Sequence, residues 1–181
     1  VWILFSLWLL GALAILAWKL VSHLAFRRRI LRNAVTVTDP ATLSVWEAEL
    51  RQANLRKPRF RLVRSPAVTT PLSVGLFRGR IRVVLPDRSY SAQELALLLR
   101  HELIHISRED SWSKFFLVFC TAMCWFNPFL WVAMKKSAED LELSCDETVL
   151  VKADADTRRR YAELILQTAG DSRGFTTCLS A

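Results

Sequence analysis

The sequence predicts an α+β chain that is mostly helical, with an N-terminal transmembrane helix followed by a domain that contains a small β-sheet. Three observations predict this class: an uninterrupted apolar run at the start, short β-type segments near the middle, and long helical patterns after them. The 181 residues are 52% hydrophobic, with a formal charge of +8 and a mean hydropathy of +0.21. A chain both this apolar and this basic is typical of a membrane protein with a basic cytoplasmic face, and such a composition argues against disorder.

The N-terminal run is long enough to cross a bilayer. Residues 1–18 carry no charge, and about 18 residues is close to the shortest helix that spans the hydrocarbon core. Lys19 can snorkel and the run resumes after it, so we assign residues 1–26 to a transmembrane helix. Three arginines follow the run, whereas a signal peptide carries its charge before it, and they place this end in the cytoplasm. A buried core helix is disfavoured, because such helices are rarely apolar on all faces.

Residues 27–57 are predicted to form a basic juxtamembrane segment and a helix. Between residues 27 and 64, ten Lys or Arg stand against three acids, which accounts for nearly all of the net charge. Attraction to anionic lipid head groups explains such a collar at about 1 kcal/mol per residue. No helix-turn-helix, zinc-finger or aromatic stacking pattern occurs, so no direct nucleic-acid partner is expected. Asp39 and Pro40 are an N-cap and a first helical residue, and they begin the helix.

The remaining domain, residues 58–169, is predicted to begin with its β-structure. A short strand is expected at residues 60–63. Residues 71–86 contain two β-type segments around Arg78-Gly79-Arg80, which predicts a hairpin or a bent edge strand. An extended substrate could pair with this segment as an added strand, or the segment could simply belong to the small sheet.

Helical patterns fill the rest of the domain. A capping box from Ser91 to Glu94 predicts a helix at residues 95–107. Residues 115–134 form a second charge-free run that Asn127-Pro128 interrupts, so it is either a kinked membrane-embedded segment or two buried helices. Further helices are expected at residues 135–152 and 157–168, and a C-terminal loop at residues 170–181. Because the chain begins without Met and stops in ordinary sequence, we expect it to be part of a longer protein, cut short within this loop.

The residues His101-Glu102-Leu103-Ile104-His105 form an H-E-x-x-H motif inside the helix that follows the capping box. Four helical residues turn about 400°, so His101 and His105 lie on nearly the same face, where two imidazoles can bind one metal ion. Glu102 is rotated about 100° from His101 and can reach a water on that metal. The motif therefore predicts a hydrolytic zinc site with Glu102 as its general base.

A catalytic zinc site normally has three protein ligands and one open position. Glu142 and Asp146 lie four residues apart on one face of a predicted helix. Glu142 could bind the metal, while Asp146 accepts a hydrogen bond from a ligating histidine. Glu109, one turn beyond His105, is the rival third ligand, and a solvated helix face is the alternative for the carboxylates of residues 139–147. Spacing alone leaves this choice open.

Two segments, LLLRHELIHISREDSWSKFF and WFNPFLWVAMKKSAEDLELSCDETVL, resemble the membrane-embedded metallopeptidase domain of the BlaR/MecR-type antibiotic sensor-transducers, a gluzincin-like family. The resemblance implies that His101, His105 and Glu142 bind zinc, that Glu102 is the base and that Asp146 orients a ligand. It also implies an antibiotic-response protease that cleaves itself and a transcriptional repressor or another regulator. Family members that sense β-lactams carry an extracellular penicillin-binding domain, which this sequence does not contain.

We therefore expect a membrane-bound zinc-dependent endopeptidase of a signal-transducing type. It is expected in the bacterial cytoplasmic (inner) membrane, with its catalytic domain on the cytoplasmic side. Expected partners are membrane lipid, a peptide or protein substrate, and a second copy in a homodimer. The alternative is a non-catalytic membrane signalling or interaction module with a structural or vestigial metal site. Structural zinc sites have four protein ligands, often thiolates; Cys145 lies in the candidate helix, but Glu102 is unnecessary for structure and favours an enzyme.

Overall fold

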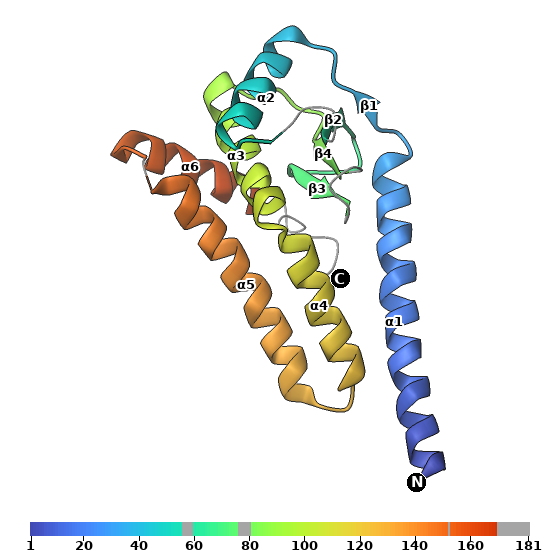
Figure 1. The fold of residues 1–181 in the computed structure, drawn as a ribbon. Helices are drawn as coiled ribbons and strands as arrows, with labels where there is room; N and C mark the ends of the chain where they lie inside the picture. Colours follow the sequence, from blue (N-terminus) through green and yellow to red (C-terminus); the bar gives the residue numbers. More distant parts are fainter. Residues whose placement is uncertain (56–59, 76–80, 152, 170–181) are drawn as a thin grey trace.

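The computed structural model describes residues 1–55, 60–75, 81–151 and 153–169. In chain order the elements are α1 (Trp2–Leu31), β1 (Val35–Thr36), α2 (Pro40–Gln52), β2 (Phe60–Arg64), β3 (Leu72–Val74), β4 (Ile81–Leu85), α3 (Ala92–Arg108), α4 (Asp110–Met123), α5 (Pro128–Leu150) and α6 (Ala155–Ala169). Figure 1 shows the sheet together with α2, α3 and α6 at one end of the molecule, which we call the head. The helical hairpin of α4 and α5 extends from the head beside α1, toward the N-terminus. The predicted class, mostly helical with a small sheet, is confirmed.

The four strands form one mixed sheet in the order β1-β2-β4-β3. β2 and β4 are parallel, while β1 pairs with β2 and β3 pairs with β4 in antiparallel fashion. The strand predicted at residues 60–63 is confirmed, and β3 and β4 pair as expected of a hairpin, with Ser73 opposite Val83. Arg78-Gly79-Arg80 lies outside the described residues. β3 is an edge strand of the sheet.

The sheet lies between α3, which carries the H-E-x-x-H motif, and the C-terminal end of α1. Because successive strand residues face opposite sides, Val83 of β4 packs in a cluster with Leu99 and Leu103 of α3, whereas Val84 packs in another cluster with Ile30 of α1. The buried Ser65 hydroxyl donates a hydrogen bond to the Ile30 carbonyl at 2.7 Å. The head is therefore attached to the last turn of α1 by both apolar and polar contacts.

The first helix extends past the segment predicted to span the membrane. α1 continues five residues beyond residue 26, because arginines are good helix formers and the charge of residues 27–29 does not end a helix. In the described chain, α1 is the one helix that is long and apolar enough to cross a membrane.

The break predicted at Asn127-Pro128 is present, and it divides residues 115–134 between the two helices α4 and α5. The side chain of Asn127 accepts a hydrogen bond from the Phe129 amide, and Pro128 occupies the first helical position, so a new helix begins there. This helix, α5, continues to Leu150, and the helix predicted to begin at residue 135 is its second half. The loop predicted at residues 170–181 lies outside the described residues.

Candidate metal centre

The two histidines and Glu102 of the motif lie in the buried middle of α3. The predicted capping box begins this helix: the Ser91 amide donates to Glu94 Oε2 at 2.8 Å, and the Glu94 amide donates to Ser91 Oγ at 3.2 Å. Caps of this kind stabilise a helix by about 1 kcal/mol. His101, Glu102 and His105 are all buried on the helix. Polar groups buried in this way need partners, because an unpaired polar group costs several kcal/mol.

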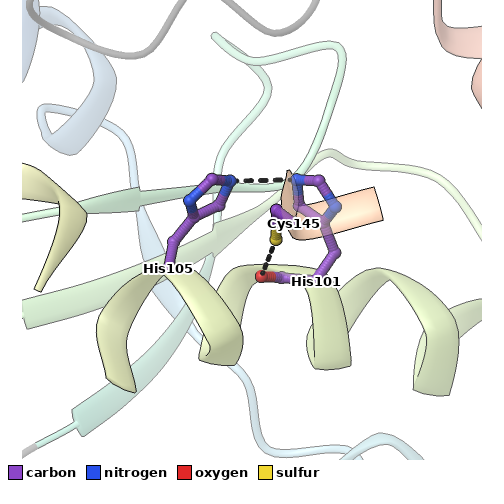
Figure 2. A group of neighbouring side chains, drawn as sticks. All are labelled: His101, His105 and Cys145. Atoms are coloured by element: carbon purple, nitrogen blue, oxygen red, sulfur yellow. Dashed lines mark hydrogen bonds between the residues drawn. The ribbon is translucent and has the colours of Figure 1, made fainter. Parts of the chain in front are cut away.

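Three donor atoms converge at one point. His101 Nε2 lies 3.1 Å from His105 Nε2, and Glu142 Oε2 of α5 lies 3.6 Å and 3.3 Å from these two nitrogens. For metal bonds of 2.0–2.1 Å in a tetrahedral site, two ligand atoms are about 3.3 Å apart. The triangle thus has the size of one face of a zinc coordination tetrahedron. Figure 2 shows the two imidazoles rising from adjacent turns of α3 with their ring nitrogens facing each other.

The outer nitrogens of both imidazoles are held by acceptors. His105 Nδ1 lies 2.7 Å from Asp110 Oδ2. His101 Nδ1 lies 2.8 Å from the Tyr161 hydroxyl and 3.1 Å from Asp146 Oδ1, and the Tyr161 hydroxyl in turn donates to Asp146 at 2.7 Å. Carboxylate acceptors require Nδ1 to carry the proton, so in the neutral rings both Nε2 lone pairs point into the triangle. This is the orientation that metal ligands need.

The charges around the site favour a cation at its centre. Burial opposes charge on the imidazoles, but hydrogen bonds to the carboxylates outweigh it, raising the pKa of His101 and raising the pKa of His105 to about 11. Burial also opposes charge on Glu142, but hydrogen bonds from the two histidines, together with Lys114, hold the pKa of Glu142 well below its usual range. A proton on an imidazole and a metal ion in the triangle are therefore alternatives that compete for the same lone pairs.

Lys114 of α4 forms an ion pair with the proposed third ligand, Glu142. Its ammonium lies 2.9 Å from Glu142 Oε1, so one carboxylate oxygen is held by α4 while the other faces the histidines. The Lys114 side chain is only 7% exposed, which makes this a partly buried ion pair rather than a surface one. The contact fixes the rotamer of Glu142 in the orientation that closes the triangle.

Glu102 points from α3 toward the edge strand. Burial raises the pKa of Glu102, while the nearby positive histidines and a hydrogen bond with Ser73 of β3 oppose that rise. A buried carboxylate with a raised pKa binds a proton more readily than one in water, which suits a general base. The Ser73 contact also places this carboxylate beside the edge of the sheet.

Cys145 is a second candidate for the third ligand. Its sulfur and the nitrogens of His101 and His105 all lie within 4.8 Å of one another, a looser group than the Glu142 triangle. Figure 2 shows the thiol directed at the His101 carbonyl, to which it donates at 3.3 Å. Glu109, the other rival, is exposed and forms the left-handed turn between α3 and α4 (φ 58°). The carboxylate that reaches His105 is that of the next residue, Asp110. The geometry therefore favours Glu142 over both rivals.

Comparison with known proteins now identifies the family. The sequence model of the family described as BlaR1 peptidase M56 matches residues 1–181. The chain belongs to the BlaR1 peptidase M56 family. It is 29% identical over 177 residues, 98% of its length, to the regulatory protein BlaR1 of Bacillus licheniformis, and 30% identical over 107 residues, 57% of its length, to the methicillin resistance mecR1 protein of Staphylococcus aureus. It covers 29% and 18% of these relatives, so it spans less than a third of either.

BlaR1 peptidase M56 proteins are metallopeptidases, and the family agrees with the resemblance seen in the sequence. Sequence reasoning missed three polar side chains around the site: Asp110, Lys114 and Tyr161. Asp110 lies three residues beyond the end of the predicted helix and could have been noticed as a carboxylate five residues after His105. Lys114 and Tyr161 carry no such signal, because they reach the site from two other helices.

Proposed function

We propose that this chain is a membrane-bound zinc-dependent endopeptidase of a signal-transducing type, which hydrolyses peptide bonds of a cytoplasmic regulator, of its own chain, or of both. The observation that carries the proposal is the triangle of His101 Nε2, His105 Nε2 and Glu142 Oε2, with edges of 3.1–3.6 Å, next to the buried Glu102. Two imidazoles and a carboxylate are a ligand set of catalytic zinc sites.

The residues present fit a zinc ion. His101, His105 and Glu142 would hold it, and Asp146 and Asp110 would keep the two imidazoles in the required tautomer. When bound, zinc supplies Lewis-acid chemistry: it lowers the pKa of a water and polarises a carbonyl. Glu102 takes the proton as water attacks the peptide carbonyl, and then delivers it to the leaving amine.

The edge strand β3 is the proposed support for the substrate. Its partner is β4 on one side, and no described strand pairs with its other side. An extended peptide added there would form main-chain hydrogen bonds and would run past Ser73, which contacts the general base. The strand would thereby hold the scissile bond within reach of Glu102.

The location proposed for the catalytic domain is the cytoplasmic side of the bacterial inner membrane. α1 supplies the span, and the arginines at its C-terminal end precede the head, as the positive-inside rule requires of a cytoplasmic domain. The proposed division is a transmembrane helix at residues 1–26, a basic segment at residues 27–57 and a peptidase domain at residues 58–169. The regulatory relatives support a role in signalling, with a transcriptional repressor as one candidate substrate.

The experiment combines metal analysis with a test for self-cleavage in the purified, lipid-reconstituted chain. The parent should contain one zinc per chain and cleave itself or an added peptide, whereas Glu102→Gln should keep the zinc and lose hydrolysis. Glu142→Gln should lose zinc, and Glu109→Gln, a matched change at an exposed carboxylate, should retain both properties. An active Glu102→Gln variant would show that the general base lies elsewhere.

The second candidate function is a signalling module with a structural metal site, and the buried Cys145 favours it. If its thiolate joined the histidines and Glu142, the site would have four protein ligands and no open position. Cys145→Ser distinguishes the two functions. The enzyme should keep its zinc content and its hydrolysis in this variant, whereas a closed structural site should lose much of its metal affinity and show no hydrolysis in the parent either.

A further inference from the structure

The hairpin of α4 and α5 exposes a large apolar surface. Residues 115–134 contain no charge. The exposed large apolar side chains in this segment are Phe115, Phe116, Phe119, Phe126, Phe129 and Val132, with Phe126 at 65% and Phe129 at 81% exposure. So many exposed apolar side chains in one charge-free segment are unusual in water and mark a site of contact with lipid or another protein.

The tip of the helical hairpin, residues 123–128, is attached to α1. The Trp8 indole N–H donates to the Met123 carbonyl at 2.7 Å, and the Trp125 indole N–H donates to the Trp8 carbonyl at 3.3 Å. Gly11 makes room for this contact, because a Cβ atom at that position would lie 2.6 Å from the Trp125 ring. The Met123 carbonyl belongs to the last turn of α4, where helical carbonyls lack backbone partners. In an apolar medium such a carbonyl needs a hydrogen-bond donor, and the Trp8 indole of the neighbouring helix supplies it.

The level of the tip along α1 can be calculated from the helical rise. Trp18 and Lys19 lie 10 and 11 residues beyond Trp8, which corresponds to about 15–16 Å. Trp18 is largely exposed, and the Lys19 ammonium lies 5.4 Å from its ring. Tryptophan and lysine together are typical of the boundary between acyl chains and head groups. The tip therefore lies about half the thickness of a 30 Å hydrocarbon core below this boundary.

The hairpin has a boundary at the same level. On α4, the partly exposed Trp112 precedes Met123 by 11 residues, or about 16 Å. On α5, the exposed Lys135 and Lys136 follow Pro128 by seven and eight residues, or about 11–12 Å. These residues and those of α1 define one plane of tryptophan and lysine. On the side of that plane that contains the tip, none of the three helices has an exposed charged residue, because Lys114 of α4 is buried and paired with Glu142.

Charged residues prevent the hairpin from entering deeper. Lys136 of α5 lies 3.3 Å from Glu139 and 3.7 Å from Asp140, and all three side chains are more than half exposed. Exposed ionised groups are strongly disfavoured in the hydrocarbon core. The apolar part of α5 before Lys135 is too short to span a bilayer, since a spanning helix needs about 20 residues.

We propose that residues 115–134 form a re-entrant hairpin that enters the leaflet on the side of the head, ends near the bilayer midplane, and has lipid acyl chains as its partner. The proposal rests on the membrane insertion of α1 proposed above. The lipid-facing surface of the hairpin continues that of α1, because the two are joined at the tip by Trp8 and Trp125. Both ends of the hairpin remain on the side of the metal centre.

Depth-dependent fluorescence quenching tests this placement. The probe is bimane on a cysteine at Phe126, in a full chain with Cys120, Cys124 and Cys178 replaced by Ala; Cys145 is fully buried and is retained. The chain is reconstituted in phosphatidylcholine–phosphatidylglycerol vesicles that carry a nitroxide at acyl carbon 5 or 12. Leu10→Cys on α1 is the matched control at the level of the tip, and Leu166→Cys on α6 is the control in water; both positions are about 70% exposed.

The deep nitroxide should quench probes at Phe126 and Leu10 at least twofold more than the shallow one, and neither should quench the probe at Leu166. Phe129→Cys is a second probe if the first variant folds poorly. A probe at Phe126 that behaves like the one at Leu166, while the Leu10 probe stays deep, overturns the hairpin proposal but leaves α1 in the membrane. Labelling of the Phe126 cysteine by an impermeant thiol reagent from the side opposite the head means that the hairpin crosses the bilayer, which also overturns it. Shallow signals at both Phe126 and Leu10 refute the membrane placement as a whole.

Discussion

Replacing Asp110 by Asn should weaken zinc binding even though Asp110 is not proposed to touch the metal. The carboxylate is almost fully buried and lies 2.7 Å from His105 Nδ1. Asparagine keeps the size of the side chain and can still accept the Nδ1 hydrogen bond through its amide oxygen, so the change removes mainly the negative charge. Loss of such a partner of a ligating histidine typically reduces metal affinity by about 10–100-fold, or about 1.4–2.7 kcal/mol.

The pH determines where in that range the effect falls. The same carboxylate helps to raise the pKa of His105 to about 11, so it also stabilises the proton that zinc must displace. Part of its contribution to zinc binding is therefore cancelled at neutral pH. We expect a loss of about tenfold at pH 7 and a larger loss at pH 9, because fewer protons compete with the metal there.

The assay is competition for zinc against a chromophoric chelator at both pH values, with Glu109→Gln as the matched control. Glu109 is the adjacent residue and is exposed, so its variant should bind zinc like the parent. Parental affinity in Asp110→Asn at both pH values, or an equal loss in Glu109→Gln, would refute the assignment of Asp110 as the residue that orients His105.

Three further outcomes are expected. Ser65→Ala removes the buried hydrogen bond to the Ile30 carbonyl and should lower the free energy of unfolding by about 1–3 kcal/mol, measured by denaturant titration in detergent. Protonation of His105 should stabilise the metal-free chain at pH values below its unfolded pKa and lose this effect as the pH rises toward 11, so the apparent zinc affinity should increase from pH 6 to pH 8, with proton release visible by calorimetry in two buffers. Arg100→Ala removes the guanidinium that donates hydrogen bonds to both oxygens of the buried Glu49 carboxylate, and it should lower the free energy of unfolding by about 1–3 kcal/mol. The double variant with Glu49→Gln should recover part of this loss, because no buried charge is then left unpaired.

The parts of the fold that depend on local pattern could be predicted from the sequence. The capping box before α3 satisfies its own backbone groups within four residues, and Asp39 caps α2 through Thr42 in the same way. The helical spacing of His101 and His105 places their ring nitrogens together for the same reason. These features are set by residues close in the sequence, so one stretch of sequence contains the whole interaction.

The remaining features depend on how the elements pack against each other. The parallel pairing of β2 with β4 follows from burial on both faces of the sheet rather than from any turn between them. Lys114 and Tyr161 reach the candidate site from α4 and α6, and neither has a spacing that relates it to the histidines. The change from apolar to charged residues at Lys135 predicts a helix boundary there, but α5 continues through it, because lysine favours helix and only Asn127-Pro128 interrupts the backbone pattern.

The separation between the donor atoms has a consequence for biosynthesis. The two histidines are carried by α3 and Glu142 by α5, and the hairpin lies between them in the chain. A nascent chain in which α4 and α5 have not yet folded back has only two of the three proposed ligands and no Lys114 contact to orient the third. If the centre is hydrolytic as proposed, it matures only after α5 has packed against α3, so ribosome-bound chains would be protected from premature proteolysis by the order of assembly alone.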